Sequence, residues 1–155
     1  MSKTNAARLL DKHGVKYELV EYKVDEEDLS AINVAAKLGQ NIKQVFKTLV
    51  VKGAGNACFV CVVPGDVEID LKKAAKAAGA KSAELIPVKD IMKITGYIRG
   101  GCSPLAMKKE YPVFIHNSCL DFEHICISAG IRGMQIKLNP KDLIAVSSAK
   151  VCEIV

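Results

Sequence analysis

Hydrophobic and polar residues follow two periods along the chain, and the period predicts which segments form helices and which form strands. Residues 4–14 place apolar side chains at helical intervals, with Thr4 or Asn5 as the N-cap and Gly14 at the end. Residues 15–22 instead alternate apolar and charged side chains, which predicts a strand. Four further helices are predicted, at residues 30–39, 70–79, 87–96 and 139–146.

The middle of the chain has the pattern of a β-hairpin. Two apolar, β-rich runs, "QVFKTLVV" at 44–51 and "ACFVCVV" at 57–63, flank the turn sequence "KGAGN". The remaining predicted strands are "GYIRG" at 96–100, "PVFIHN" at 112–117, "EHICIS" at 123–128, "GMQIKL" at 133–138 and "KVCEIV" at 150–155.

The order of these elements predicts the fold class. Helices and strands are interspersed, but the strands come mostly as hairpins and meanders. We therefore expect a single α+β domain over residues 1–155, with a mixed, mostly antiparallel curved sheet and flanking helices. A doubly wound parallel sheet is the less favoured alternative.

Composition narrows the class of protein. The chain of 155 residues is half hydrophobic and a quarter charged, which is a globular balance. No signal-like segment and no run of about 18 apolar residues is present, so we expect a cytoplasmic protein without a membrane span. The formal charge of +5 biases its partners weakly toward anions such as RNA.

The six cysteines predict core packing more than chemistry. Cys58 and Cys61 form a C-x-x-C, but a strand sends these two side chains to opposite faces. His116, His124 and Cys126 lack a regular metal spacing. We expect no disulfide framework, no metal and no cofactor.

Lys47 is the first candidate for chemistry. Strand alternation places it on the same face as the apolar residues Val45, Leu49 and Val51. Such a lysine either extends its ammonium to solvent or lies in a cleft, where desolvation makes the charge useful. The pattern alone leaves both interpretations open.

The stretch "RGGCSPLAMKKEYP" is the second candidate. Cys102 or Ser103 could be a nucleophile, but nothing in the spacing pairs either one with a histidine base. Gly100 and Gly101 let a ligand approach the main chain, where successive amides can stabilise an oxyanion. A tight turn before Pro104 explains the same glycines equally well.

Four segments together resemble the YbaK family of aminoacyl-tRNA deacylases. They are "QVFKTLVV", "DLKKAAKAAGAK", "TGYIRGGCSPLAMKK" and "ICISAGIRGMQIKL". That family includes the Cys-tRNA(Pro) deacylase and is related to the editing domain inserted in some prolyl-tRNA synthetases. The resemblance implies a sheet curved around a pocket, and hydrolysis of the ester that joins a wrong amino acid to the terminal ribose of tRNA.

The resemblance also implies site residues. It assigns Lys47, Gly100 and Gly101 to the scissile ester, with a substrate thiol as the attacking group and no metal. The implied substrate-binding residues are Tyr22, Thr48, Ser103, Ser128 and Gly130. The candidate tRNA contacts are the basic residues Lys72, Lys73, Lys76, Lys108, Lys109 and Arg132.

The function expected from this resemblance is trans-editing of mischarged tRNA(Pro), most of all Cys-tRNA(Pro), with prolyl-tRNA synthetase as a candidate partner. Two alternatives stay open: a deacylase for another small amino acid such as alanine, and a non-catalytic adaptor that binds tRNA or a synthetase. One departure bears on substrate preference, because Gln135 stands where many relatives carry an acidic residue.

Overall fold

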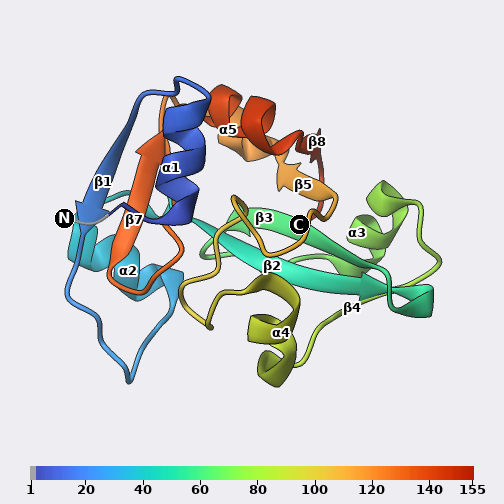
Figure 1. The fold of residues 1–155 in the computed structure, drawn as a ribbon. Helices are drawn as coiled ribbons and strands as arrows, with labels where there is room; N and C mark the ends of the chain where they lie inside the picture. Colours follow the sequence, from blue (N-terminus) through green and yellow to red (C-terminus); the bar gives the residue numbers. More distant parts are fainter. Residues whose placement is uncertain (1–2) are drawn as a thin grey trace.

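The structure is a computed structural model that describes residues 3–155, shown in Figure 1. Its helices are α1 (Asn5–Lys12), α2 (Ala31–Leu38), α3 (Leu71–Ala78), α4 (Ile91–Thr95) and α5 (Pro140–Ser147). Its strands are β1 (Tyr17–Glu21), β2 (Phe46–Gly53), β3 (Cys58–Pro64), β4 (Ala83–Leu85), β5 (Val113–His116), β6 (Ile125–Ser128), β7 (Met134–Leu138) and β8 (Lys150–Cys152). The predicted α+β class is confirmed.

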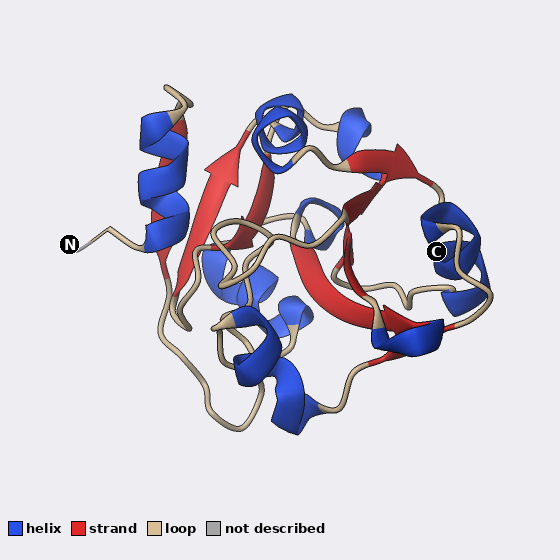
Figure 2. Cartoon of the chain, turned by 45° about the vertical axis from the view of Figure 1, so that its right-hand side comes forward, coloured by secondary structure: helices blue, strands red, loops and turns tan. Residues whose placement is uncertain are grey.

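The strands form two sheets, which Figure 2 shows as separate groups with α1 lying along the smaller one. The larger sheet has the order β4-β2-β3-β5-β8, and the smaller has the order β1-β7-β6. Pairing is antiparallel except between β3 and β5 and between β5 and β8. An isolated parallel bridge from Val45 to Cys126 links the two sheets beside the start of β2.

The hydrophobic core lies on both faces of the larger sheet. On one face, Phe46, Val60 and Val62 pack toward the smaller sheet and toward α1 and α5. On the other face, Val51 and Cys61 pack against α3. The hairpin β2–β3 is therefore buried on both sides, which explains its near-continuous apolar sequence. Since Cys61 is fully buried, its predicted place in the core is confirmed.

The helix boundaries follow local chemistry. Ser30 and Asp70 accept hydrogen bonds from the first turns of α2 and α3, as their N-cap positions predict. Both helices end at a glycine in the left-handed conformation, Gly39 and Gly79. Among residues 3–155, no helix is long and apolar enough to cross a membrane.

Two sequence predictions need correction, and one strand was missed. The predicted strand at residues 96–100 is wrong: Gly96 and Gly100 both have a φ of +83°, so this segment turns instead of extending. The predicted helix at 87–96 is split into a 3₁₀ turn at Val88–Asp90 and the short α4. The edge strand β4 was not predicted, because its three residues carry too little pattern.

Candidate functional site

A cavity of about 600 Å³ opens beside β2, between α2, the segment that leads into α4, and the loop around Gly100. The smaller sheet contributes two residues to the lining, Ser128 on β6 and Gln135 on β7. Four of the predicted site residues line this one cavity: Lys47, Thr48, Gly100 and Ser128. The fold therefore brings together residues from two sheets and one loop.

Lys47 lies on β2 opposite Val63 and is half-buried. Burial lowers the pKa of its ammonium, and the nearby carboxylates of Glu68 and Asp66 act in the opposite direction. Among the described residues, none forms a hydrogen bond or ion pair with the Lys47 ammonium. A partly desolvated cation of this kind is available to a ligand that brings negative charge.

The glycine loop presents fewer free amides than the sequence suggested. The Gly101 amide donates to the carbonyl of Ile98 at 3.0 Å, so it serves the turn itself. A Cβ on Gly101 would lie 3.1 Å from the main-chain carbon of Ile131, so glycine lets the two loops approach. Within residues 3–155, no acceptor binds the amides of Gly100 and Cys102, and both residues line the cavity.

Arg132 links its own loop before β7 to two other segments near the cavity, those of Arg99 and Glu26. Its Nε donates to the carbonyl of Arg99 at 2.8 Å, and its Nη1 lies 2.8 Å from a carboxylate oxygen of Glu26. We call this three-residue contact the Arg132 clasp. An arginine was expected here as a tRNA contact, but in the structure its guanidinium holds the glycine loop against the loop after β1.

Cys102 lines the cavity but has the chemistry of a buried thiol. Burial raises its pKa to about 11, and a hydrogen bond with Thr95 offsets only part of that rise. At neutral pH the thiol is therefore protonated and a poor nucleophile. Its position in the cavity does not make it reactive.

The other predicted substrate-binding residues serve the loops or lie outside the cavity lining. Ser103 is fully buried, and its hydroxyl accepts from the amide of Leu105 at 3.2 Å. Gly130 has a φ of +104°, and a Cβ there would lie 2.9 Å from the ring of Tyr97. Tyr22 donates its amide to the Gly133 carbonyl beside β7.

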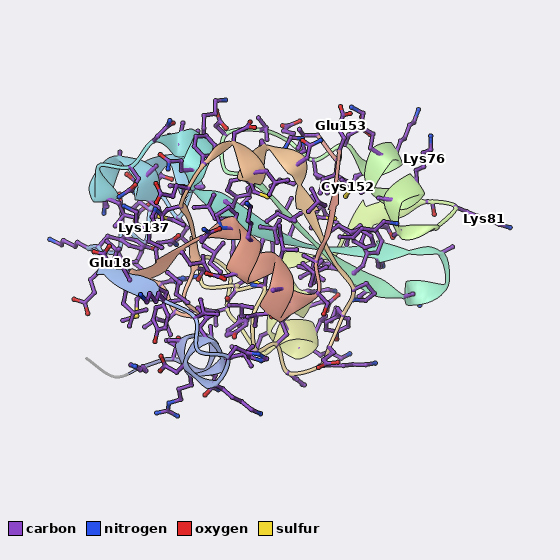
Figure 3. The ribbon with its side chains drawn as sticks, turned by 90° about the horizontal axis from the view of Figure 1, so that it is seen from above. Glu18, Lys76, Lys81, Lys137, Cys152 and Glu153 are labelled. Carbon is purple, nitrogen blue, oxygen red and sulfur yellow. The ribbon has the colours of Figure 1, made fainter. Side chains whose placement is uncertain are left out.

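The basic candidates divide into two groups. Lys72, Lys73 and Lys76 belong to α3, at the opposite end of the molecule from α2 and its side of the cavity. Figure 3 shows Lys76 projecting outward from that end. Glu153 lies 2.9 Å from the ammonium of Lys73, so this lysine is already paired.

Lys108 and Lys109 follow the glycine loop in the chain. The amide of Lys108 donates to the carbonyl of Thr95 at the end of α4, and Ile91 at the start of the same short helix lines the cavity. Both lysines are exposed, and the Lys109 ammonium lies 5.9 Å from the centre of the Tyr111 ring. Neither lysine lines the cavity itself, and Lys109 lines a second cavity beside the end of α5.

Sequence reasoning missed the acidic side of the site. Glu27 and Asp28 line the cavity, and Glu26 completes the Arg132 clasp. The run "DEED" at residues 25–28 was the available signal, since four consecutive acids in a connecting loop are unusual between apolar elements. The pairing of Glu26 with Arg132, more than 100 positions away, carries no local signature.

Comparison with known families gives one match over most of the chain. The model described as "Aminoacyl-tRNA editing domain" matches residues 26–146. The Enterococcus faecalis protein named "Putative Cys-tRNA(Pro)/Cys-tRNA(Cys) deacylase EbsC" is 44% identical over 152 residues, which cover 98% of this chain and 93% of that protein.

Solved structures agree on the fold. The structure described as "hypothetical protein APE2540" superposes with a TM-score of 0.89 at 20% identity, covering 97% of this chain and 99% of the other. A second, described as "a putative trans-editing enzyme for prolyl tRNA synthetase", has a TM-score of 0.83 at 23% identity and covers 99% and 98% of the two chains. At such identities the likeness concerns the fold alone.

Proposed function

This chain belongs to the aminoacyl-tRNA editing domain family, and we propose that it is a free-standing deacylase that removes wrongly attached amino acids from tRNA(Pro). Its preferred substrate in this proposal is Cys-tRNA(Pro). The protein would act in the cytoplasm and correct the product of prolyl-tRNA synthetase. The observation that carries the proposal is that Lys47, with its partly desolvated ammonium, and Gly100, whose amide has no acceptor within residues 3–155, both line one cavity.

These two groups suit the developing charge of ester hydrolysis. When a nucleophile adds to the ester carbonyl, the carbonyl oxygen becomes an oxyanion, which the amides of Gly100 and Cys102 can stabilise as donors. The Lys47 ammonium adds a positive charge that is only partly screened by water. Removal of one such donor commonly costs about 3 to 4 kcal/mol of transition-state stabilisation.

The attacking group for a cysteinyl ester is the substrate's own thiol. Its sulfur forms a bond to the carbonyl carbon, the bond from that carbon to the ribose oxygen breaks, and the thiol proton goes to the departing oxygen. Water then opens the resulting cyclic thioester and yields free cysteine. The protein supplies orientation and charge stabilisation, which fits the protonated state of Cys102.

The direct test is deacylation of Cys-tRNA(Pro) by the wild-type protein and two cavity variants. Lys47→Ala should lower kcat/KM by about 100-fold or more, because it removes the cation beside the oxyanion. Cys102→Ala is the matched control and should stay within about twofold of wild type, because a protonated thiol takes no part. Equal rates for Lys47→Ala and wild type would remove Lys47 from the mechanism.

A panel of aminoacylated tRNAs separates the alternatives. Hydrolysis of Ala-tRNA(Pro) at the rate of Cys-tRNA(Pro) would contradict the thiol-assisted step, because alanine has no side-chain nucleophile. Binding of tRNA without turnover of any ester would favour the adaptor role instead.

A further inference from the structure

The rim of the cavity between β4 and α4 is apolar and exposed. Leu85 at the end of β4 and Val88 in the 3₁₀ turn both line the cavity, yet they are 48% and 56% exposed. Met92 in α4 follows Val88 four positions later and is 50% exposed. Exposed apolar side chains that gather beside a cavity are typical of a surface that a ligand covers.

The same rim carries positive charge. Lys89 and Lys93 are exposed and are interleaved with the apolar residues in the run "VKDIMK" at 88–93, where Asp90 is the one acid. Among the described residues, neither ammonium forms an ion pair. The β4–α4 rim is the name we give to Leu85, Val88, Lys89, Met92 and Lys93.

The rim on the side of α2 has the opposite charge. Glu27 and Asp28 line the cavity there and belong to the acidic run of residues 25–28. Phosphate groups are repelled on this side and attracted on the side of the two lysines. A polyanionic chain that leaves the cavity is therefore directed over the β4–α4 rim.

An aminoacyl ester brings a chain of this kind. The ester lies at the end of a tRNA strand whose last nucleotides are unpaired, so an ester bound beside Lys47 makes those nucleotides cross the rim of the cavity. We propose that the β4–α4 rim binds the unpaired nucleotides next to the aminoacylated adenosine, with base faces on Val88 and Met92 and phosphates beside Lys89 and Lys93. Single strands are commonly bound by this combination of base contacts and positive charge. The inference rests on the proposed deacylase function and names a further part of its substrate that the protein holds.

A protein partner is the competing occupant of an exposed apolar surface. Lysine is depleted in protein–protein interfaces, whereas here two lysines are interleaved with the apolar side chains. The rim is also continuous with the cavity, because Leu85 and Val88 belong to both. Charge and continuity together favour a nucleic acid.

Binding of two non-hydrolysable analogues measures the contribution of the rim. One is the seryl amide of 3′-amino-3′-deoxyadenosine, and the other carries the same amide at the end of the trinucleotide CCA. For wild type, the Kd of the trinucleotide should be about 100-fold lower, because it adds base contacts and two phosphates. Equal Kd values, or no binding of the trinucleotide, would overturn the proposal without any variant.

Met92→Ser tests the base contacts. It removes an apolar contact from the exposed rim and should lower the ratio of the two Kd values by about tenfold. Leu120→Ser is the matched control, because Leu120 is also 50% exposed but lies in the turn after β5, outside the cavity lining. It should keep the wild-type ratio. An unchanged ratio in Met92→Ser would overturn the base contacts.

Lys89→Ala/Lys93→Ala tests the phosphate contacts. Each phosphate contact on a single strand contributes about 0.7 to the slope of log K against log salt, so the slope for the trinucleotide should decrease in magnitude by about 1.4. Lys12→Ala/Lys16→Ala is the control with the same charge change, because both lysines are exposed and lie outside the cavity lining. An unchanged slope, or an equal decrease in both double variants, would overturn the phosphate contacts.

These assays keep the two hypotheses apart, because binding needs no turnover. If wild type hydrolyses none of the esters, the deacylase function fails, while the Kd ratio still tests the rim. If wild type hydrolyses Cys-tRNA(Pro) but binds both analogues equally, the function stands and the role of the rim fails. Equal Kd values together with loss of binding to purified prolyl-tRNA synthetase in Met92→Ser would replace the proposal with a protein-docking surface.

Discussion

At the scale of single residues, Lys47 combines a functional position with a cost to stability. Its ammonium is half-buried on β2 and lacks a hydrogen bond to any described residue, and burial lowers its pKa. A folded protein that lowers the pKa of a lysine binds its proton less well than the unfolded chain does. Stability therefore increases with pH where this group titrates.

Replacement of Lys47 by methionine should raise the melting temperature at pH 7, because an apolar side chain of similar length needs no desolvation of a charge. The gain should be full below the folded-state pKa and should vanish as pH rises through the ordinary lysine value of 10.5, where the unfolded chain also loses its proton. Thermal unfolding followed by circular dichroism between pH 7 and pH 11 measures this.

Lys72→Met is the matched control, because Lys72 is exposed on α3 and should show no such pH-dependent gain. A lower melting temperature for Lys47→Met at pH 7, or a gain that persists unchanged above pH 10.5, would contradict the electrostatic cost assigned to Lys47.

At the residue scale, the sequence predicted the strand position of Lys47 but not the hydrogen bonding of the glycine loop. Strand alternation was sufficient to place Lys47 among apolar neighbours. The engagement of the Gly101 amide by Ile98 depends on the path of the turn, and the unpaired oxygen of Gln135 depends on the packing of two sheets. Neither property belongs to a local pattern, so neither could be derived from one segment.

At the scale of elements, the Arg132 clasp holds the cavity wall in place. It joins the loop that precedes β7 to the glycine loop and to the acidic loop after β1. The glycine loop carries the Gly100 amide, so its position decides where an oxyanion donor stands. The clasp is thus a positioning contact for the proposed chemistry.

Arg132→Lys tests that role against a direct contact with tRNA. Lysine keeps the positive charge but cannot donate to both Arg99 and Glu26 in the geometry of a guanidinium. We expect kcat to fall by about 10- to 100-fold through misplacement of the loop, with KM for tRNA and its salt dependence nearly unchanged. Steady-state kinetics at several salt concentrations would measure this.

An unchanged kcat with a raised KM for tRNA would instead favour a direct contact of Arg132 with tRNA. If Arg132→Lys keeps the wild-type kcat, the clasp does not position the glycine loop. Glu26→Gln is the companion variant, because it weakens the clasp without touching a basic residue, and it should lower kcat in the same direction.

Elements with complete local signals were predicted well. The β2–β3 hairpin has two apolar runs around a glycine turn, and α3 has both an N-cap and a terminal glycine. The segment 96–100 was misassigned because Tyr97 and Ile98 look like strand residues. In the structure, Tyr97 instead donates its hydroxyl to the carbonyl of Leu105 at 2.6 Å, a tertiary contact that overrides the local pattern.

At the scale of the whole molecule, the cavity and the two basic groups define how a tRNA could approach. Lys108 lies beside the end of α4, a helix whose first residue, Ile91, lines the cavity, whereas the α3 lysines lie at the other end of the molecule. We therefore predict that a tRNA whose acylated end enters the cavity contacts Lys108 and Lys109 rather than the α3 lysines.

The double variant Lys108→Ala/Lys109→Ala should raise KM for aminoacyl-tRNA with kcat nearly unchanged. Since each lost phosphate contact removes about 0.9 from the slope of log K against log salt, the slope should decrease in magnitude by about 1.8. Lys72→Ala/Lys76→Ala is the matched control with the same charge change, and it should have a smaller effect on both quantities. An equal effect of the two double variants would mean that position relative to the cavity does not matter.

The two sheets contribute different parts of the cavity and are joined near it by the bridge from Val45 to Cys126. Lys47, which belongs to the proposed reaction, lies on the larger sheet, while the lining residues Ser128 and Gln135 lie on the smaller one. Substitutions on β6 and β7 could then change which error is removed and leave the hydrolytic apparatus intact. A scaffold divided in this way allows proofreading enzymes to diverge in substrate, and to be redesigned, by changes confined to one wall.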